Sequence, residues 1–222
     1  NINYNIHVGE SAVIKHNIFQ NFANSNKLYL TSNSVCEKNS LYNQNTYNFS
    51  DGFVRNFHHA HLNGEYSNAS LKGCFFLKNK NICSNKTNII HNAENCVSDQ
   101  TYKGILNDYS KANYYSNTFV SENAQKTEGY QLSKGILLTD NCSFFSKPEL
   151  RIFADDVKCS HGSTIGPVDE SALYYLRSRG INKKQAMKMI ISSFIKEDLQ
   201  NLNKNTVKKI SFNLSEYLNS ML

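Results

Sequence analysis

Two residues with metal-binding and nucleophilic side chains, Cys159 and His161, stand two positions apart in the sequence. If the run 157–161 is extended, side chains at i and i+2 point to one face of the strand. A thiolate beside an imidazole suits iron, zinc or an iron–sulfur cluster, and it also resembles a nucleophile beside its base. A lone cysteine is more often a small buried hydrophobe, so this pair alone leaves packing, metal binding and catalysis open.

The elements that must position this pair are predicted to be β-strands. The segment 150–153 alternates apolar and polar residues, which indicates a strand. Residues 1–146 show no sustained helical period, and short apolar runs recur there between clusters of Asn, Ser, Asp and Gly. This pattern is typical of a sandwich, a barrel or a β-helix. A faint repeat favours the β-helix. In this repeat a small residue precedes a run of alternating apolar and polar residues, and the repeat has no clean period.

The hydrophobic period changes to a helical one after Gly166. Asp169 and Glu170 suit the beginning of a helix, and Gly180 is predicted to end it. Asn182 is predicted to cap a second helix with Gln185. The apolar face of that helix comprises Met187, Ile190, Ile191, Phe194 and Ile195. A third helix is expected from about Thr206, with its stripe at Val207, Ile210, Leu214, Leu218 and Met221. We expect the two amphipathic helices to pack on each other.

The composition narrows the class of protein. The chain has 222 residues and a formal net charge of +6, but its lysines are scattered along the sequence, which favours a solvated surface over a nucleic-acid site. Its six cysteines are too dispersed for a secreted disulfide framework. We find in the sequence no apolar run long enough to span a membrane, no signal peptide and no Walker-type phosphate loop. We therefore expect a protein of a reducing compartment, and the strand-like beginning suggests a longer protein upstream.

The segment from Lys147 to Ile181 closely resembles the C-terminal signature of SufD in the SufB/SufD family of SUF iron–sulfur cluster assembly scaffolds. The quoted runs are KPELRIFADDVKCSHGSTIG and VDESALYYLRSRGI. Upstream the similarity is thinner and includes Cys83, Thr87, His91, Cys96, Gln100, Tyr102, Lys103, Gly104, Gln125, Lys126, Thr127 and Gln131. The Cys-Ser-His-Gly sequence at residues 159–162 distinguishes this chain from SufB, the paralogous subunit.

The resemblance implies a fold and an organisation. The expected fold is mainly β, a right-handed parallel β-helix over residues 1–166, followed by a small α-helical segment over 167–222. The family's N-terminal helical domain does not precede the β-helix in this sequence. The resemblance also implies a non-catalytic scaffold that pairs with SufB through its last strands and holds the ATPase SufC with its C-terminal helices. It implies neither a nucleic-acid partner nor a membrane.

The resemblance also assigns roles to residues. His161 becomes a candidate ligand or proton carrier, and Cys159 a neighbouring thiol and candidate ligand, at the junction with SufB, where a transient iron–sulfur cluster would form without a stably bound cofactor. The alternative for Cys159 is packing at that junction. Tyr175 and Arg179, on one helix face, and Gly180 are expected at the SufC interface. Weaker candidates are His91, Cys83 and Cys96, which we expect to be core residues. The expected compartment is a plastid of the apicoplast kind or, alternatively, a bacterial cytoplasm.

Two enzymes remain as alternatives to the scaffold. A polysaccharide-acting β-helix enzyme needs paired carboxylates in a groove, and adjacent acidic residues occur only at Asp155–Asp156 and Asp169–Glu170. A Cys–His hydrolase would use Cys159 and His161, and it would need a third group to orient the histidine.

Overall fold

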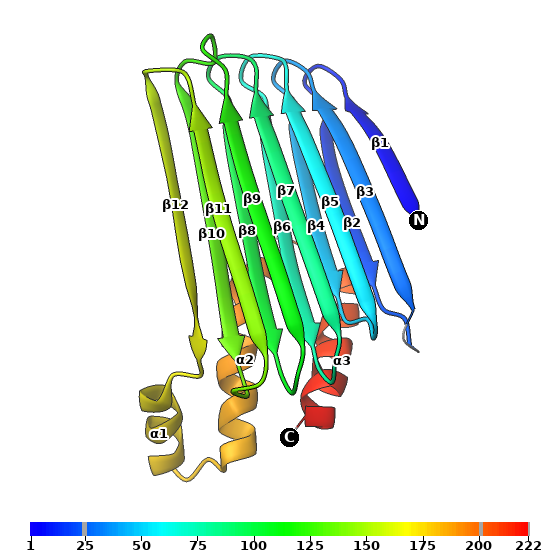
Figure 1. Cartoon of the computed structure of the whole chain (residues 1–222), viewed down its shortest axis with the longest axis vertical. Helices are drawn as coiled ribbons and strands as arrows, with labels where there is room; N and C mark the ends of the chain where they lie inside the picture. Colours follow the sequence, from blue (N-terminus) through cyan, green and yellow to red (C-terminus); the bar gives the residue numbers. More distant parts are fainter. Residues whose placement is uncertain (24–25, 200–201, 222) are drawn as a thin grey trace.

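The computed structural model describes residues 1–23, 26–199 and 202–221, in which twelve parallel strands wind into a solenoid of six turns. Each turn places one strand in each of two facing sheets (Figure 1). Sheet A consists of β1 (Ile2–Val8), β3 (Lys27–Cys36), β5 (Phe53–Leu62), β7 (Ile82–His91), β9 (Lys111–Val120) and β11 (Ser143–Ile152). Sheet B consists of β2 (Val13–Gln20), β4 (Leu41–Asn48), β6 (Asn68–Leu77), β8 (Val97–Leu106), β10 (Thr127–Leu137) and β12 (Val157–Pro167).

Alternate side chains of each strand point into the solenoid, as the period of a strand requires. Because the strands pair in register, inward residues of successive turns stack in columns, such as Leu30, Asn56, Asn85 and Tyr114. The inward side chains are buried, and the outward ones of the same strands are partly exposed. The parallel β-helix expected from the sequence is therefore confirmed.

Many inward residues are polar, and they hydrogen-bond to one another across turns. Ser32 donates to Gln44 at 2.8 Å and lies 2.7 Å from His58 Nδ1. Farther along the axis, the amides of Gln100 and Gln131 both donate to Thr118, at 2.8 and 2.7 Å. Buried polar groups are tolerated when they are paired in this way. The interior is thus held by a hydrogen-bonded axis as well as by apolar packing.

The turns between sheets A and B repeat with the solenoid. Residues with φ near +57° occupy equivalent places in these turns, at Ser11, Asn39, Tyr66, Asn95 and Lys126. Each donates its backbone N–H to a carbonyl of the next turn, for example Asn39 to Glu65 at 2.9 Å. The spacing of these positions varies from 27 to 31 residues, which explains why the sequence repeat lacks a clean period.

Three helices follow the last strand: α1 (Glu170–Ser178), α2 (Lys183–Leu199) and α3 (Lys204–Met221). Their ends largely follow the predictions, and Asp169, expected as a negative charge at the beginning of α1, is its N-cap. The Asp169 carboxylate accepts from two backbone N–H groups of α1, and Gly180 ends that helix with φ +84°. Asn182 Oδ1 accepts from Gln185 N at 2.9 Å. The third helix begins at Lys204, two residues earlier than expected, because Asn203 provides its cap.

Helices α2 and α3 pack on the outward face of sheet B as well as on each other. They lie behind the lower part of the sheets in Figure 1. Ile191 and Leu214 join the outward residues Phe76 and Ile105 in one apolar cluster. The Tyr217 hydroxyl donates to two backbone carbonyls of sheet B, at 2.7 and 3.1 Å. The side chain of Met221, expected on the apolar stripe, lies outside the described residues. None of the helices described is both long enough and apolar enough to cross a membrane.

The terminal edge as the candidate functional site

The last turn of the solenoid leaves one edge of each sheet without a described neighbour. In the described chain, β12 pairs with β10 and β11 pairs with β9, and neither has a strand on its other side. We call these two free edges and the inward side chains of β11 and β12 the terminal edge. Such an edge presents unpaired N–H and C=O groups, which template the addition of another strand.

Cys159 and His161 both lie on β12 at the terminal edge. Their register partners on β10 are Gly129 and Gln131, which are inward residues, so the pair shares the inward face of its strand. Residues two positions apart on a strand have their Cα atoms about 6.6 Å apart. Cys159 is half-buried beside the small cluster of Val120, Ala124 and Ala154, and His161 is exposed. The strand register therefore places the two side chains on one face of β12, as predicted.

The environment of Cys159 keeps its thiol protonated at neutral pH. Partial burial raises the pKa of the thiol, and a hydrogen bond from the backbone of Gly129 partly opposes this. A Cβ added to Gly129 would lie 3.2 Å from the Cys159 sulfur, so the absence of a side chain there makes room for the thiol. A metal that binds this sulfur must displace its proton. Gly129 was not singled out in the sequence, because a glycine's role opposite a thiol depends on strand register.

The described residues do not complete a metal site around this pair. They contain no group of three or more His, Cys, Asp or Glu side chains placed to hold one ion. Cys159 and His161 can therefore supply two donors, whereas zinc and the irons of clusters are usually held by four. A metal or nascent cluster bound at the terminal edge would need further donors from outside the described chain.

The chemistry of the pair also bears on the hydrolase alternative. A cysteine nucleophile needs a lowered pKa or an adjacent base, and burial raises the pKa of Cys159. For the polysaccharide enzyme, a general acid needs a raised carboxyl pKa. The carboxyl groups of Glu128 and Glu149 have pKa values lowered by hydrogen bonds from Lys158 and Arg151. Burial thus shifts the pKa of Cys159 away from that of an activated nucleophile, and the hydrogen bonds shift the pKa values of these two carboxyl groups away from that of a general acid.

The three upstream candidates lie buried in inner turns and do not meet Cys159 or His161. Amide groups of Asn48 and Asn85 donate to the Cys83 sulfur at 3.3 Å, and burial raises its pKa to about 12.

The other two upstream candidates have equally local partners. Cys96 lies 3.4 Å from the Ser67 hydroxyl. His91 lies 2.8 Å from Ser98, and burial lowers its pKa to about 4. All three candidates are therefore hydrogen-bonded core groups in this fold.

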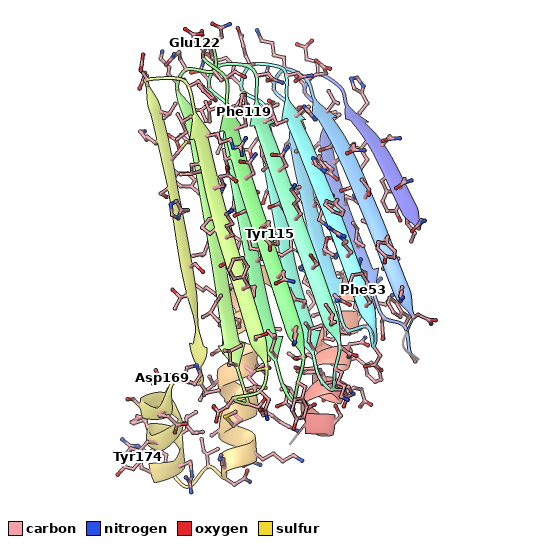
Figure 2. All side chains as sticks on the ribbon, in the orientation of Figure 1. Phe53, Tyr115, Phe119, Glu122, Asp169 and Tyr174 are labelled. Atoms are coloured by element: carbon pink, nitrogen blue, oxygen red, sulfur yellow. The ribbon has the colours of Figure 1, made fainter. Side chains whose placement is uncertain are left out.

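The candidate interface residues of α1 form an exposed aromatic and basic surface. The Arg179 guanidinium lies 5.3 Å from the ring centroid of Tyr175, which is 58% exposed. Tyr174, which the sequence analysis did not single out, is 76% exposed and points away from the solenoid (Figure 2). Gly180 directly follows this surface and turns the chain toward α2.

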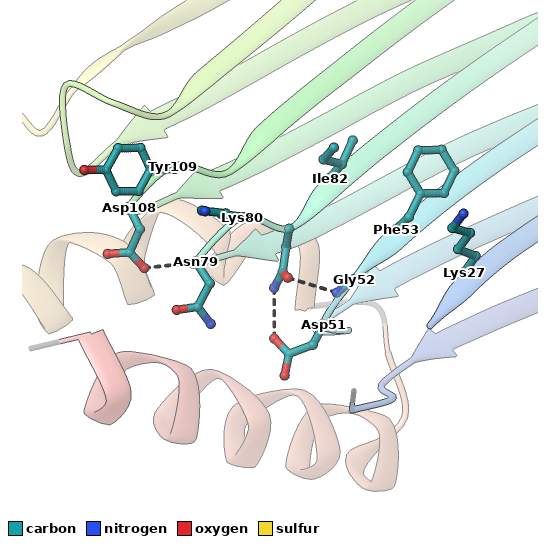
Figure 3. A pocket seen from close by; sticks show the side chains of 10 residues that line it. Lys27, Asp51, Gly52, Phe53, Asn79, Lys80, Ile82, Asp108 and Tyr109 are labelled. Carbon is teal, nitrogen blue, oxygen red and sulfur yellow. Dashed lines mark hydrogen bonds between the residues drawn. The ribbon is translucent and has the colours of Figure 1, made fainter. Parts of the chain in front are cut away.

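A hollow of about 800 Å³ lies elsewhere, among the turns that lead from sheet B into sheet A (Figure 3). Its polar groups bond to one another: Asn81 donates to Asp51 and accepts from Gly52, and Asn79 N donates to Asp108. These bonds hold adjacent turns together. Because they use the polar groups of the hollow, the feature is explained by the architecture of the turns.

Comparison with known proteins places these observations in a family. Residues 1–194 match the family described as the SufBD core domain of SUF system FeS cluster assembly. The Escherichia coli iron–sulfur cluster assembly protein SufD is 38% identical over 136 residues, which cover 61% of this chain and 32% of that protein.

Two further relatives come from Synechocystis and Arabidopsis thaliana. A SufBD family protein of Synechocystis is 28% identical over 203 residues, covering 91% of this chain and 45% of that protein. A chloroplastic protein of Arabidopsis thaliana is 39% identical over 105 residues, covering 47% of this chain and 22% of its own length. The chain thus spans less than half the length of these relatives. With the solenoid and the match over residues 1–194, these likenesses show that the chain belongs to the SufBD family of SUF iron–sulfur cluster assembly and is SufD-like.

Proposed function

We propose that this chain is a non-catalytic scaffold that pairs with SufB through the terminal edge and contributes Cys159 and His161 to the site where an iron–sulfur cluster forms. The observation that carries the proposal is the coincidence of two features on one strand. β12 is an unpaired edge, and it holds two neighbouring soft donors that cannot complete a site alone.

The terminal edge has the properties of a strand-pairing surface. β11 and β12 are 10 and 11 residues long, and native proteins usually shorten, cover or charge an edge of that length. Inward apolar side chains of the last turn, including Leu150 and Ile165, are only partly buried. A second β-helix placed end to end would pair both edges and cover these side chains. Pairing of this kind is a recurring mode of recognition.

The geometry of the donors suits a shared site. A cluster iron or a zinc ion takes four ligands, and two are available here. Donors from SufB would complete the set, so that the cluster assembles only when the pair of subunits exists. The raised thiol pKa means that cluster binding releases a proton from Cys159. The cluster is cargo in this scheme and leaves the scaffold.

The α1 surface supports a second contact, with the ATPase SufC. Tyr174, Tyr175 and Arg179 combine exposed rings with a stacked guanidinium, and Tyr and Arg are enriched among residues that anchor interfaces. Gly180, with φ +84°, fixes the direction in which the chain leaves α1 next to this surface. For the compartment we propose a plastid or a bacterial cytoplasm, because the relatives include a chloroplastic and a bacterial protein.

Co-expression with SufB and SufC tests the pairing. We expect the three chains to elute together from size exclusion. The variant Ser163→Lys adds an inward charge at the terminal edge and should abolish co-elution of SufB while SufC stays bound. Asn17→Lys, an exposed substitution at the other end of the solenoid, should leave the complex intact. Equal retention of SufB by both variants would refute pairing through this edge.

The ligand role requires a separate test. His161→Ala and Cys159→Ala should leave the ternary complex intact and fail to restore cluster delivery in cells that lack the native protein. His61→Ala, a change at a partly buried histidine on the outward side of sheet A, is the matched control. Full complementation by both terminal-edge variants would show that neither residue is a ligand.

A further inference from the structure

The outward faces of the two sheets differ in what covers them. Helices α2 and α3 pack on sheet B, whereas the described chain places no helix on the outward side of sheet A. Figure 2 looks onto that side, where Phe53 stands on β5 and both Tyr115 and Phe119 stand on β9. We call the outward side chains of β3, β5, β7, β9 and β11 the bare face.

The bare face concentrates the positive charge of the chain. The six strands of sheet A carry a single acidic residue, Glu149, which Arg151 binds at 2.7 Å. The cations of these strands are Lys27, Arg55, Lys86, Lys111, Lys147 and Arg151, and all six are exposed. Six cations and one carboxylate leave five positive charges in excess, compared with +6 for the whole chain. The excess on this face comes from the near-absence of carboxylates on the strands of sheet A.

Aromatic residues alternate with these cations across the strands. Phe57, Lys86, Tyr115 and Lys147 are successive register partners on β5, β7, β9 and β11. Adjacent members of this row are about 4.8 Å apart along the sheet. Tyr115 is 39% exposed and Phe145 beside it is 52% exposed. Exposed aromatic area on a flat face, mixed with arginine, is typical of interaction surfaces.

A shallow hollow lies in the middle of the bare face. Its volume is about 570 Å³, and its lining includes Arg55, Lys86, Tyr115 and Asn117. The hollow thus offers positive charge and ring edges to a partner.

The arrangement of the rings decides which class of macromolecule fits. Single-stranded nucleic acid stacks its bases on open ring faces. Here the rings pair with each other: Tyr115 and Phe145 lie 5.8 Å apart at 52°, and Tyr29 and Phe53 lie 5.6 Å apart at 44°. The Arg55 guanidinium also stacks over Phe57 at 4.9 Å. Because these rings are tilted against one another and do not stand apart as separate stacking platforms, the observations favour a protein.

We propose that the bare face docks a protein partner with an acidic surface, independently of the terminal edge. Carboxylates of the partner would meet Arg55, Lys86 and Lys147, and its side chains would cover Tyr115 and Phe145. Complementary charge of this kind steers association and makes it sensitive to salt. The partner therefore occupies the side of the solenoid that faces away from α2 and α3.

The test uses the whole chain and two labelled probes, a random copolymer of glutamate and tyrosine and a 15-nucleotide oligo-dT. Anisotropy is measured at low and moderate salt. We expect the copolymer to bind more tightly than oligo-dT. The triple variant Arg55→Glu, Lys86→Glu and Lys147→Glu should weaken copolymer binding by about tenfold or more. The matched variant Lys15→Glu, Lys184→Glu and Lys208→Glu changes the net charge equally at exposed positions off the bare face and should bind as the parent does.

A second pair of variants separates docking from simple charge attraction. Tyr115→Ser and Phe145→Ser keep every charge, and together they should weaken copolymer binding about threefold or more. Circular dichroism and the melting temperature check that each variant folds. Equal losses in the two triple variants, tighter binding of oligo-dT, no copolymer binding, or an unchanged aromatic variant would each overturn the proposal. None of these outcomes depends on SufB pairing or cluster assembly.

Discussion

Two buried histidines should make the stability of this protein fall as the pH drops from 7 to 5. His58 and His91 are both fully buried in the solenoid. Burial lowers the pKa of His58 to about 3 and that of His91 to about 4. In the unfolded chain a histidine titrates near 6.5. Between these values the unfolded chain binds protons that the folded chain does not, so the free energy of unfolding rises with pH.

The magnitude follows from those pKa values. At pH 5 an unfolded histidine is almost fully protonated, whereas His58 and His91 remain mostly neutral in the fold. Each site then lowers the free energy of unfolding by about 2 kcal/mol relative to pH 7. The pair gives about 4 kcal/mol, a large fraction of the stability of an ordinary domain. Burial also lowers the pKa values of His16 and His59, which act in the same direction.

Urea denaturation at pH 7, 6 and 5 measures this slope. The interval avoids Glu128 and Glu149, whose lowered pKa values affect stability only at more acidic pH. The double variant His58→Gln and His91→Gln should reduce the pH-dependent loss by about 4 kcal/mol. A different stability at pH 7 does not affect the test, because only the pH dependence of the free energy of unfolding is compared.

The matched control for these variants is His61→Gln, because His61 is only partly buried on the bare face. It should retain the pH dependence of the parent chain. A parent chain with the same stability at pH 5 and pH 7 would refute the neutral burial of His58 and His91. A double variant with an undiminished slope would do so as well.

Three further perturbations test local features. Tyr217→Phe removes a buried hydroxyl that bonds two carbonyls of sheet B, and it should lower the free energy of unfolding by about 1–2 kcal/mol in urea denaturation; no loss would contradict the docking of α3. Gly129→Ala places a Cβ 3.2 Å from the Cys159 sulfur, whereas a Cβ at Gly166 meets no atom within 4 Å. Gly129→Ala should therefore melt at a lower temperature than Gly166→Ala. The reverse order of melting temperatures would refute the close approach of Gly129 to Cys159. Cys159 is half-buried and the other five cysteines are buried, so iodoacetamide should label it first in the native chain, faster as the pH rises toward its raised pKa; mass spectrometry that found another cysteine modified first would contradict the structure.

The sequence predicted the elements in which local chemistry is decisive. The negative charge of Asp169 at the beginning of α1, the cap at Asn182 and the helix end at Gly180 depend on residues within one turn of the helix, and all three occur as expected. The shared face of Cys159 and His161 follows from the period of a strand alone. The parallel β-helix itself was favoured by pattern and specified by family resemblance.

The sequence was less informative where burial and polarity do not coincide. In β5 the inward positions include Asn56 and His58, and the outward ones include Phe57. This reverses the usual rule that apolar residues point inward, so the apolar runs in the sequence are shorter than the strands. The docking of α2 and α3 on sheet B and the excess of positive charge on the bare face are tertiary effects. They depend on residues about thirty positions apart that the register brings side by side.

Hydrogen exchange of this chain with and without SufB tests the terminal edge most directly. Pairing would place the alternate backbone amides of β11 and β12 that point away from β9 and β10 in hydrogen bonds to the partner, so their exchange should slow in the complex. Amides of β1, at the opposite end of the solenoid, should exchange at unchanged rates. Protection that appeared elsewhere and left both terminal strands unchanged would contradict the claim that SufB pairs at this edge.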